Sequence, residues 1–276
     1  WLVRPFGLIT DYVRYVRAQR SFSLPRLSRR ALGAIGAAYD EMRDALAGRN
    51  YVADYVQTLT HELKSPLSAI RGAAELLQEP MPKADRQRFL GNITRETQRV
   101  QELVDHMLEL AALETRRQLD NPAPIFLKPL LEEIAASAAA VGSTRQVKVQ
   151  LEIQQEACIE GDIFLIRRAV TNLIDNAIDF SPAGATVSIT LGTMHKTVQI
   201  QVRDKGPGIP EYAEEKVFEK FFSLARPHSK KKSTGLGLAF VKEIVELHRG
   251  RVSLKNALDG GALAILSLPL LPTPTV

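Results

Sequence analysis

The chain has 276 residues, of which 45% are hydrophobic and 24% charged, and its formal net charge is +5. This composition is typical of a folded protein and excludes collagen-like, low-complexity and disulfide-rich scaffolds. Cys158 is the single cysteine, so no intrachain disulfide can form. No apolar run reaches the roughly 18 residues that a membrane-spanning helix needs, and the length predicts about two domains with a short extra module.

The positive charge is concentrated near the N-terminus. Residues 1–49 contain nine arginines and four acidic residues, whereas basic and acidic residues balance at 27 each over the remaining 227 residues. An arginine-rich end can bind nucleic acid or acidic lipid, or can flank a membrane helix on its cytoplasmic side. Trp1 followed closely by Arg4 favours the membrane flank. We therefore expect a membrane link through a missing N-terminal segment and no direct nucleic-acid partner, with a solvated basic helix as the simpler alternative.

Helices are predicted throughout the first 120 residues. Two short helices with a connector at Pro25 suggest a signal-relay module within residues 1–49. Apolar residues at helical spacing over 56–77 and 89–110 predict two long helices, which the turn at 79–82 joins as an antiparallel hairpin. One hairpin cannot bury both apolar seams, so we expect two copies to form a four-helix bundle, that is, a homodimer.

Beyond an expected linker at residues 121–124, strands and helices are mixed. Apolar residues alternate with polar ones in the segments expected as half-buried strands: 147–153, 187–191, 198–202, 252–254 and 263–268. Helices are expected over 127–140, 162–180 and 235–248. This mixture, with strand pairs at hairpin spacing, predicts an α+β two-layer sandwich.

The first motif that could take part in a reaction is His-Glu-Leu-Lys-Ser-Pro, which begins at His61. At 100° per residue, His61 and Ser65 project almost directly away from the apolar seam of their helix, so burial of the imidazole is not expected. A neutral histidine is a competent nucleophile near pH 7, and the adjacent Glu62 could accept its proton. A lone histidine on a helix usually has no catalytic role, so this motif supports a function only together with the other motifs of the chain.

Two further motifs point to a nucleotide site. Asn172 and Asn176 share one helix face, where an amide oxygen could bind Mg²⁺. Asp204 follows a strand and could accept a hydrogen bond from an exocyclic amine, while Gly206 and Gly208 would let a planar ring approach. Surface amides and an ordinary turn explain the same residues without any ligand.

A fourth motif, residues 233–238, is a glycine-rich helix start, where backbone N–H groups bind phosphate. Arg226 and the lysines at 230–232 precede it, as in a lid over a polyphosphate, although a solvated basic loop is the plainer interpretation. A Walker-type ATPase is not supported, because its glycine-lysine sequence is absent.

In order and spacing, these motifs resemble those of the bacterial sensor histidine kinases of two-component systems. The segments similar to the phosphoacceptor, asparagine, first glycine, phenylalanine and second glycine boxes are 61–66, 172–180, 204–210, 217–222 and 235–238. Residues 1–49 resemble the HAMP relay of that family. The sequences at 61–74, 173–180 and 235–241 are most similar to CreC-type kinases.

The resemblance implies three domains and an activity. A HAMP-like relay would span 1–49, an all-α dimerisation and phosphotransfer hairpin 50–120, and a GHKL (Bergerat) ATP-binding sandwich 121–276. The implied activity is Mg-ATP-dependent autophosphorylation on His61 and transfer to an aspartate of a response regulator, with phosphatase activity toward it as a further implication. This portion would lie on the cytoplasmic side of the bacterial inner membrane.

The resemblance also implies individual roles. His61 would be phosphorylated, Glu62 would be its general base, and Ser65 would assist the phosphatase reaction. Asn176 would bind Mg²⁺ with Asn172 near the phosphates. Asp204 would hold the adenine amine of ATP. The other residues expected to shape the ATP pocket are Gly206, Gly208, Phe218, Thr234, Gly235, Leu236, Gly237 and Leu238.

Two residues depart from the family pattern on the phosphate side of the pocket. Asp179 stands where Lys or Arg is frequent, and Ser223 where Arg often follows the two phenylalanines. Either Arg226 or a lysine among 230–232 substitutes, or ATP binds less tightly than usual. These departures support an alternative, a non-catalytic ATP-binding scaffold with a degenerate pocket. A GHKL ATPase of the chaperone or mismatch-repair kind would fit the sandwich but not the histidine-bearing hairpin.

Overall fold

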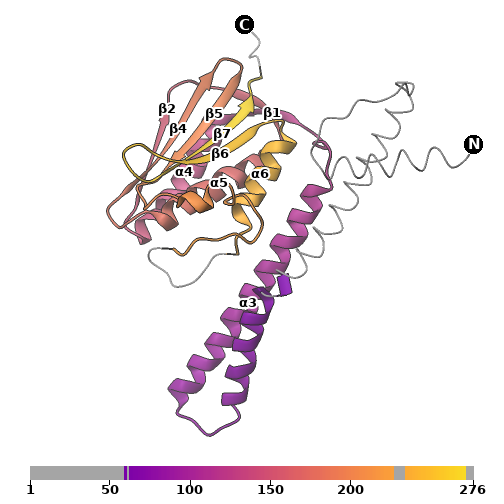
Figure 1. Cartoon of the computed structure of the whole chain (residues 1–276), viewed down its shortest axis with the longest axis vertical. Helices are drawn as coiled ribbons and strands as arrows, with labels where there is room; N and C mark the ends of the chain where they lie inside the picture. Colours follow the sequence, from indigo (N-terminus) through magenta and orange to yellow (C-terminus); the bar gives the residue numbers. More distant parts are fainter. Residues whose placement is uncertain (1–58, 61, 227–233, 272–276) are drawn as a thin grey trace, which may run out of the picture. The chain divides into compact units, whose positions relative to one another are not determined.

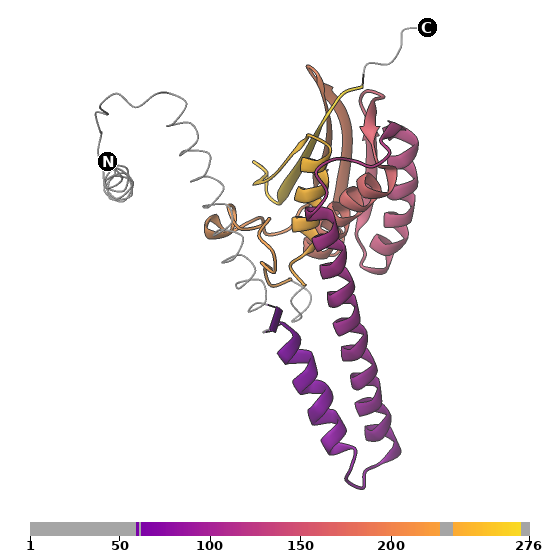
Figure 2. The same cartoon turned by 90° about the vertical axis from the view of Figure 1, so that its right-hand side faces the viewer.

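The computed structural model describes residues 59–60, 62–226 and 234–271 (Figure 1). Residues 62–76 are helical, and a turn connects them to α3 (Lys83–Glu114), which runs back alongside (Figures 1 and 2). The predicted helical hairpin is thus confirmed. The HAMP-like relay expected at 1–49 and His61, the expected phosphoacceptor, lie outside the described residues. Within the described residues, none of the helices combines the length and apolar character needed to cross a membrane.

The rest of the described chain is built around a five-stranded sheet in the order β2-β4-β5-β7-β6. The strands are β2 (Lys148–Ile153), β4 (Thr186–Met194), β5 (Thr197–Arg203), β6 (Arg251–Asn256) and β7 (Ala262–Pro269). β2 pairs with β4 in parallel, and the remaining pairs are antiparallel. Buried and partly exposed residues alternate along β4 and β5, so one face of the sheet packs on a core.

Three helices cover that face: α4 (Leu127–Thr144), α5 (Ile163–Phe180) and α6 (Gly237–Leu247) (Figure 1). The side chain of Asp162 caps α5 by accepting hydrogen bonds from Phe164 N and Leu165 N at 2.9 and 3.2 Å, which fixes where the helix begins. Ile174 of α5 is fully buried in this core. The predicted α+β two-layer sandwich is confirmed.

The expected linker at 121–124 is wrong in part, because a small second sheet begins there. β1 (Ala123–Phe126) pairs antiparallel with β3 (Cys158–Gly161), and neither strand was predicted. Ile125 and Ile159 are opposite each other and almost completely buried. Strands of four residues carry little local signal, and Pro124 suggests a break rather than an edge strand. The short 3₁₀ helix η1 (Glu211–Ala213) was also not predicted.

Candidate nucleotide-binding site

A cavity of about 280 Å³ lies among α5, the start of α6 and the segment that follows β5. It gathers residues from three of the four motifs. The predicted site residues that line it are Asn172, Asn176, Gly208, Thr234, Gly235, Gly237 and Leu238. These residues are far apart in the sequence, so the fold itself assembles them into one site.

α5 contributes its asparagine face to the cavity. Asn172 and Asn176 are four residues apart and therefore project from one side of the helix, and both are partly buried. The amide nitrogen Nδ2 of Asn172 donates a hydrogen bond to the carbonyl of Gly237 at 3.3 Å. This bond ties the middle of α5 to the first residue of α6. Behind the asparagines, Ile174 faces the core.

Glycine is required at the entrance to α6. Gly235 has a φ of +67°, and a Cβ there would lie 2.4 Å from the carbonyl carbon of Phe221. At Gly237 a Cβ would meet nothing within 4 Å. Leu236, between them, is fully buried and does not line the cavity. The close approach of Phe221 thus shapes a helix start, where the first backbone N–H groups have no partner within the helix and can bind an anion.

Asp204 is almost buried, with 8% of its surface exposed. Its Oδ1 accepts hydrogen bonds from Gly206 N at 2.7 Å and Ala262 N at 3.0 Å. Burial raises the pKa of the Asp204 carboxyl, and these two bonds oppose that shift. Because Oδ1 already accepts two bonds within the chain, Oδ2 is the oxygen that could accept a hydrogen bond from a ligand. At Gly206 a Cβ would lie 2.5 Å from the Phe180 carbonyl oxygen.

Several predicted site residues do not line the cavity: Asp204, Gly206, Phe218 and Leu236. Phe218 packs instead on a buried cluster that includes Val217. Glu62 and Ser65 lie on the hairpin and are likewise not part of the cavity. Ser65 is exposed, as its predicted direction away from the seam requires.

Among the cavity residues that sequence reasoning missed are His106, Arg168 and Phe240, which come from separate elements. The guanidinium of Arg168 lies 4.7 Å from the centroid of the Phe240 ring and 2.6 Å from the carboxylate of Glu109. The His106 ring packs edge-on against the same phenylalanine at 6.2 Å between centroids. Only Arg168 had a usable signal, since it precedes Asn172 by four residues on the same helix face.

Comparison with known proteins agrees with this architecture. Residues 52–116 match the family model of the His Kinase A (phospho-acceptor) domain, and residues 161–272 match that of the histidine kinase-, DNA gyrase B- and HSP90-like ATPase. The sensor protein CreC of Escherichia coli K12 is 39% identical over 269 residues, which cover 97% of this chain and 56% of CreC. The sensor-like histidine kinase SenX3 of Mycolicibacterium smegmatis is 30% identical over 80% of this chain and 58% of SenX3. The chain spans a little over half the length of these relatives.

Two solved structures share the fold. The histidine kinase ThkA, in complex with the response regulator TrrA, has a TM-score of 0.68 and 24% identity, covering 86% of this chain and 67% of that one. Full-length ShkA in complex with AMPPNP has a TM-score of 0.60 and 24% identity, covering 80% of this chain and 47% of that one. The chain belongs to the sensor histidine kinases. Within that family, its expected similarity to CreC is confirmed.

Proposed function

We propose that this chain binds Mg·ATP in the cavity, transfers the γ-phosphoryl group to His61 and passes it on to an aspartate of a response regulator. The observation that carries the proposal is the meeting of two elements over one cavity. The asparagine face of α5 and the glycine-bounded start of α6 are joined there by the bond from Asn172 to Gly237. The complex of ShkA with AMPPNP supports ATP as the nucleotide.

Asn176 is the proposed protein ligand of Mg²⁺. Its amide is partly exposed to the cavity, and an amide oxygen suits a hard cation that takes most of its ligands from water and substrate phosphates. When bound, Mg²⁺ would neutralise charge that develops on the phosphates. Asn172 and Thr234 would lie beside the phosphate chain, and Asp204 would accept the adenine amine. Phe218 and Leu236 would support the pocket walls from the core.

The phosphoryl transfer uses two neighbouring residues of the hairpin. Glu62 accepts the proton from one ring nitrogen of His61, and the other nitrogen attacks the γ-phosphorus. A P–N bond forms as the P–O bond to the leaving ADP breaks. In the second step the receiver aspartate attacks, so that a P–O bond forms and the P–N bond breaks. Ser65, exposed one helical turn after His61, would assist hydrolysis of the phosphorylated receiver.

The proposed partners are a second copy of the chain and a response regulator receiver domain. Two hairpins would form a four-helix bundle and so complete their apolar seams. The complex of ThkA with TrrA supports a response regulator as the second partner. A membrane link, on the cytoplasmic side of the bacterial inner membrane, is proposed from the arginine-rich residues 1–30 and from the naming of CreC as a sensor protein.

Label transfer from γ-labelled ATP with Mg²⁺ tests the function directly. We expect an acid-labile, base-stable label on the parent chain and on His195→Gln, a control at an exposed turn, and no label on His61→Gln. A chain that binds ATP but takes no label in any form would be a non-catalytic scaffold. ATP turnover without a phosphoprotein would instead indicate an ATPase of the chaperone or mismatch-repair kind.

The role of Ser65 has a separate test. Ser65→Ala should slow dephosphorylation of the phosphorylated receiver domain while leaving label transfer to His61 intact. Ser68→Ala, at another exposed serine on the same helix, is the control. If Ser65→Ala dephosphorylates the receiver as fast as the parent does, the phosphatase role is wrong.

A further inference from the structure

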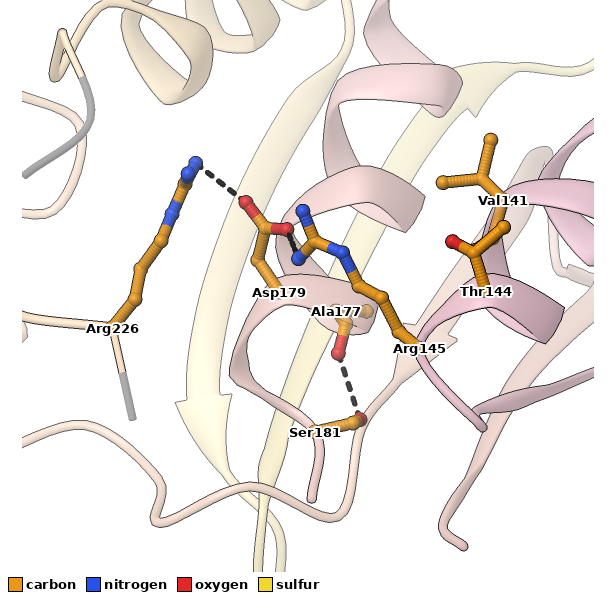
Figure 3. Close-up of polar contacts among 7 residues, drawn as sticks. All are labelled: Val141, Thr144, Arg145, Ala177, Asp179, Ser181 and Arg226. Carbon is orange, nitrogen blue, oxygen red and sulfur yellow. Dashed lines mark hydrogen bonds and ion pairs between the residues drawn. The ribbon is translucent and has the colours of Figure 1, made fainter. Parts of the chain in front are cut away.

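Asp179, in the last turn of α5, lies between two arginines (Figure 3). Its Oδ2 is 2.5 Å from Nη2 of Arg226, and its Oδ1 forms an ion pair with Nη1 of Arg145. The aspartate side chain is 10% exposed, so each oxygen of a nearly buried carboxylate is matched by a guanidinium. Ser181 Oγ donates to the carbonyl of Ala177 at 2.7 Å and closes the helix end that carries Asp179.

The two arginines differ in position. Arg226 lines the cavity together with Asn176 and Asp179, whereas Arg145 is not among the lining residues. The Arg226 side chain is 26% exposed and that of Arg145 is 48% exposed. Arg226 is therefore the one of the pair that faces the nucleotide site, and Arg145 approaches Asp179 from outside it.

Helix geometry places this pair on the phosphate side of the cavity. Asn172, Asn176 and Asp179 are spaced by four and three residues, which puts them on one face of α5. Asp179 therefore holds Arg226 about one helical turn beyond the proposed Mg²⁺ ligand. Asp175 is also near both arginines: burial raises the pKa of its carboxyl, and Arg145 and Arg226 oppose that rise.

Arg226 keeps hydrogen-bonding capacity while it is bound to Asp179. A guanidinium carries five N–H donors on two edges, so one edge can bind a carboxylate while another binds phosphate. Nε of Arg226 is buried and has no hydrogen-bond partner among the described residues. An anion that enters the cavity would satisfy this donor.

Charge balance explains why two arginines are needed. An aspartate at the phosphate side would repel ATP, and one arginine would only cancel it. With Arg145 and Arg226 both paired to Asp179, the triad has a net charge of +1. Asp175 also interacts with both arginines, so the four residues together are neutral, and the two arginines cancel the charge of the two acids that would otherwise repel the phosphate chain.

We infer that Arg226 binds the phosphate chain of ATP, that Asp179 positions it, and that Arg145 neutralises the remaining charge of Asp179. This inference rests on the proposed function, because it assigns the phosphate-side cation of the same site. Arg226 thus takes the role left open by Asp179 and Ser223.

The test compares the affinities of the chain for adenosine, ADP and ATP at fixed Mg²⁺, measured by calorimetry. Arg226→Gln should weaken ATP binding about 10- to 100-fold, the range expected for a lost charge-assisted hydrogen bond. Adenosine affinity should stay within about 2-fold of the parent value, because adenosine has no phosphate. Arg226→Lys should recover part of the ATP affinity, and Arg251→Gln, at an exposed strand position, is the matched control.

A double-mutant cycle tests the positioning role of Asp179. In the parent background Asp179→Asn should weaken ATP binding, because Arg226 loses its anchor. In the Arg226→Gln background the same change should strengthen ATP binding, because it removes an acid that no longer positions a cation. Arg145→Gln should weaken ATP binding less than Arg226→Gln. If Asp179→Asn changes the ATP affinity by the same factor in both backgrounds, the positioning role is wrong.

The outcomes also separate this inference from the proposed function. If the parent binds ATP and is labelled, but Arg226→Gln binds ATP equally well, the inference fails and the kinase function stands. If Arg226→Gln weakens adenosine and ATP equally, Arg226 only holds its segment in place and the inference is wrong. If the parent binds no ATP, both the proposed function and the inference are wrong.

Discussion

The sandwich and the hairpin differ in how far one chain completes their cores. In the sandwich, α5 and the sheet bury residues such as Ile174, Leu191 and Ile200 completely. In the hairpin, no residue of α3 before Leu103 is buried, and the predicted seam residue Phe89 is only partly covered. The sandwich therefore buries its apolar residues within one chain, whereas the hairpin leaves part of its apolar surface exposed.

The exposed apolar residues of α3 have a pattern. Leu90, Val104 and Leu108 are 49%, 38% and 65% exposed, and their spacing of 14 and four residues places them on one face. Leu103 and Met107 are buried on a different face. A helix in a four-helix bundle packs apolar residues against more than one neighbouring helix. One apolar face of α3 is buried within the chain and a second is exposed, which supports the proposed homodimer. The stability of the sandwich should thus be independent of protein concentration, and that of the hairpin should depend on it.

The largest effect on stability should come from a large-to-small substitution in the sandwich core. Ile174→Ala should reduce the free energy of unfolding by about 2–5 kcal/mol, because it removes buried methyl groups and leaves a cavity. Denaturant unfolding followed by circular dichroism at two protein concentrations should give the same loss at both. Ile163→Ala, at a 43% exposed position of the same helix, is the control. A loss no greater than that of the control would mean that this contact between helix and sheet does not stabilise the sandwich.

The next effect should come from the glycine at the entrance to α6. Gly235→Ala should cost about 1–3 kcal/mol, because its φ of +67° and the nearby Phe221 backbone both disfavour a Cβ. Gly237→Ala should cost nothing or stabilise slightly, because its Cβ meets no atom and alanine favours helix. Thermal unfolding of both variants tests this difference in stability, and equal melting temperatures for Gly235→Ala and Gly237→Ala would contradict the prediction.

The hairpin should respond through dimerisation instead. Replacing Leu90 and Leu108 together with serine should raise the dimer dissociation constant about 10- to 100-fold, because interface leucines lose apolar contact. Sedimentation equilibrium measures this constant. Leu258→Ser, at an exposed turn of the sandwich, should leave it unchanged. A parent chain that stays monomeric at all concentrations would remove the basis for this prediction.

The smallest effect is a pH dependence that belongs to the sandwich. His248 is 4% exposed, and its Nε2 accepts a hydrogen bond from Asp162 N at 3.0 Å while Nδ1 donates to the Ile244 carbonyl at 2.7 Å. Burial lowers the pKa of His248 below its usual 6.5. The unfolded chain therefore binds the proton more readily than the folded chain, so stability is complete above pH 6.5 and falls as the pH drops below it.

The expected loss is up to about 1.4 kcal/mol per pH unit until the folded-state pKa is reached. Unfolding titrations between pH 5 and 8 would reveal this slope, which His248→Gln should flatten and the exposed His195→Gln should preserve. An unchanged slope in His248→Gln would show that another group titrates.

The sequence alone was sufficient for elements with a long and regular pattern. The alternation in β4 and β5, the apolar face of α5 and the two seams of the hairpin all encode their structure within a few residues. The shared face of Asn172 and Asn176 was predictable for the same reason, since helical spacing alone determines it.

Tertiary structure decided whatever depends on residues that are distant in sequence. The pairing of β1 with β3 joins two four-residue strands whose local patterns are too short to identify. The ion pairs of Asp179 join the C-terminal end of α5 to Arg145 and Arg226, and no spacing in the sequence specifies such a meeting. From the sequence alone, an aspartate in place of the usual cation suggests weakened ATP binding. Only the fold shows two arginines at its carboxylate, because charge compensation depends on distance in space.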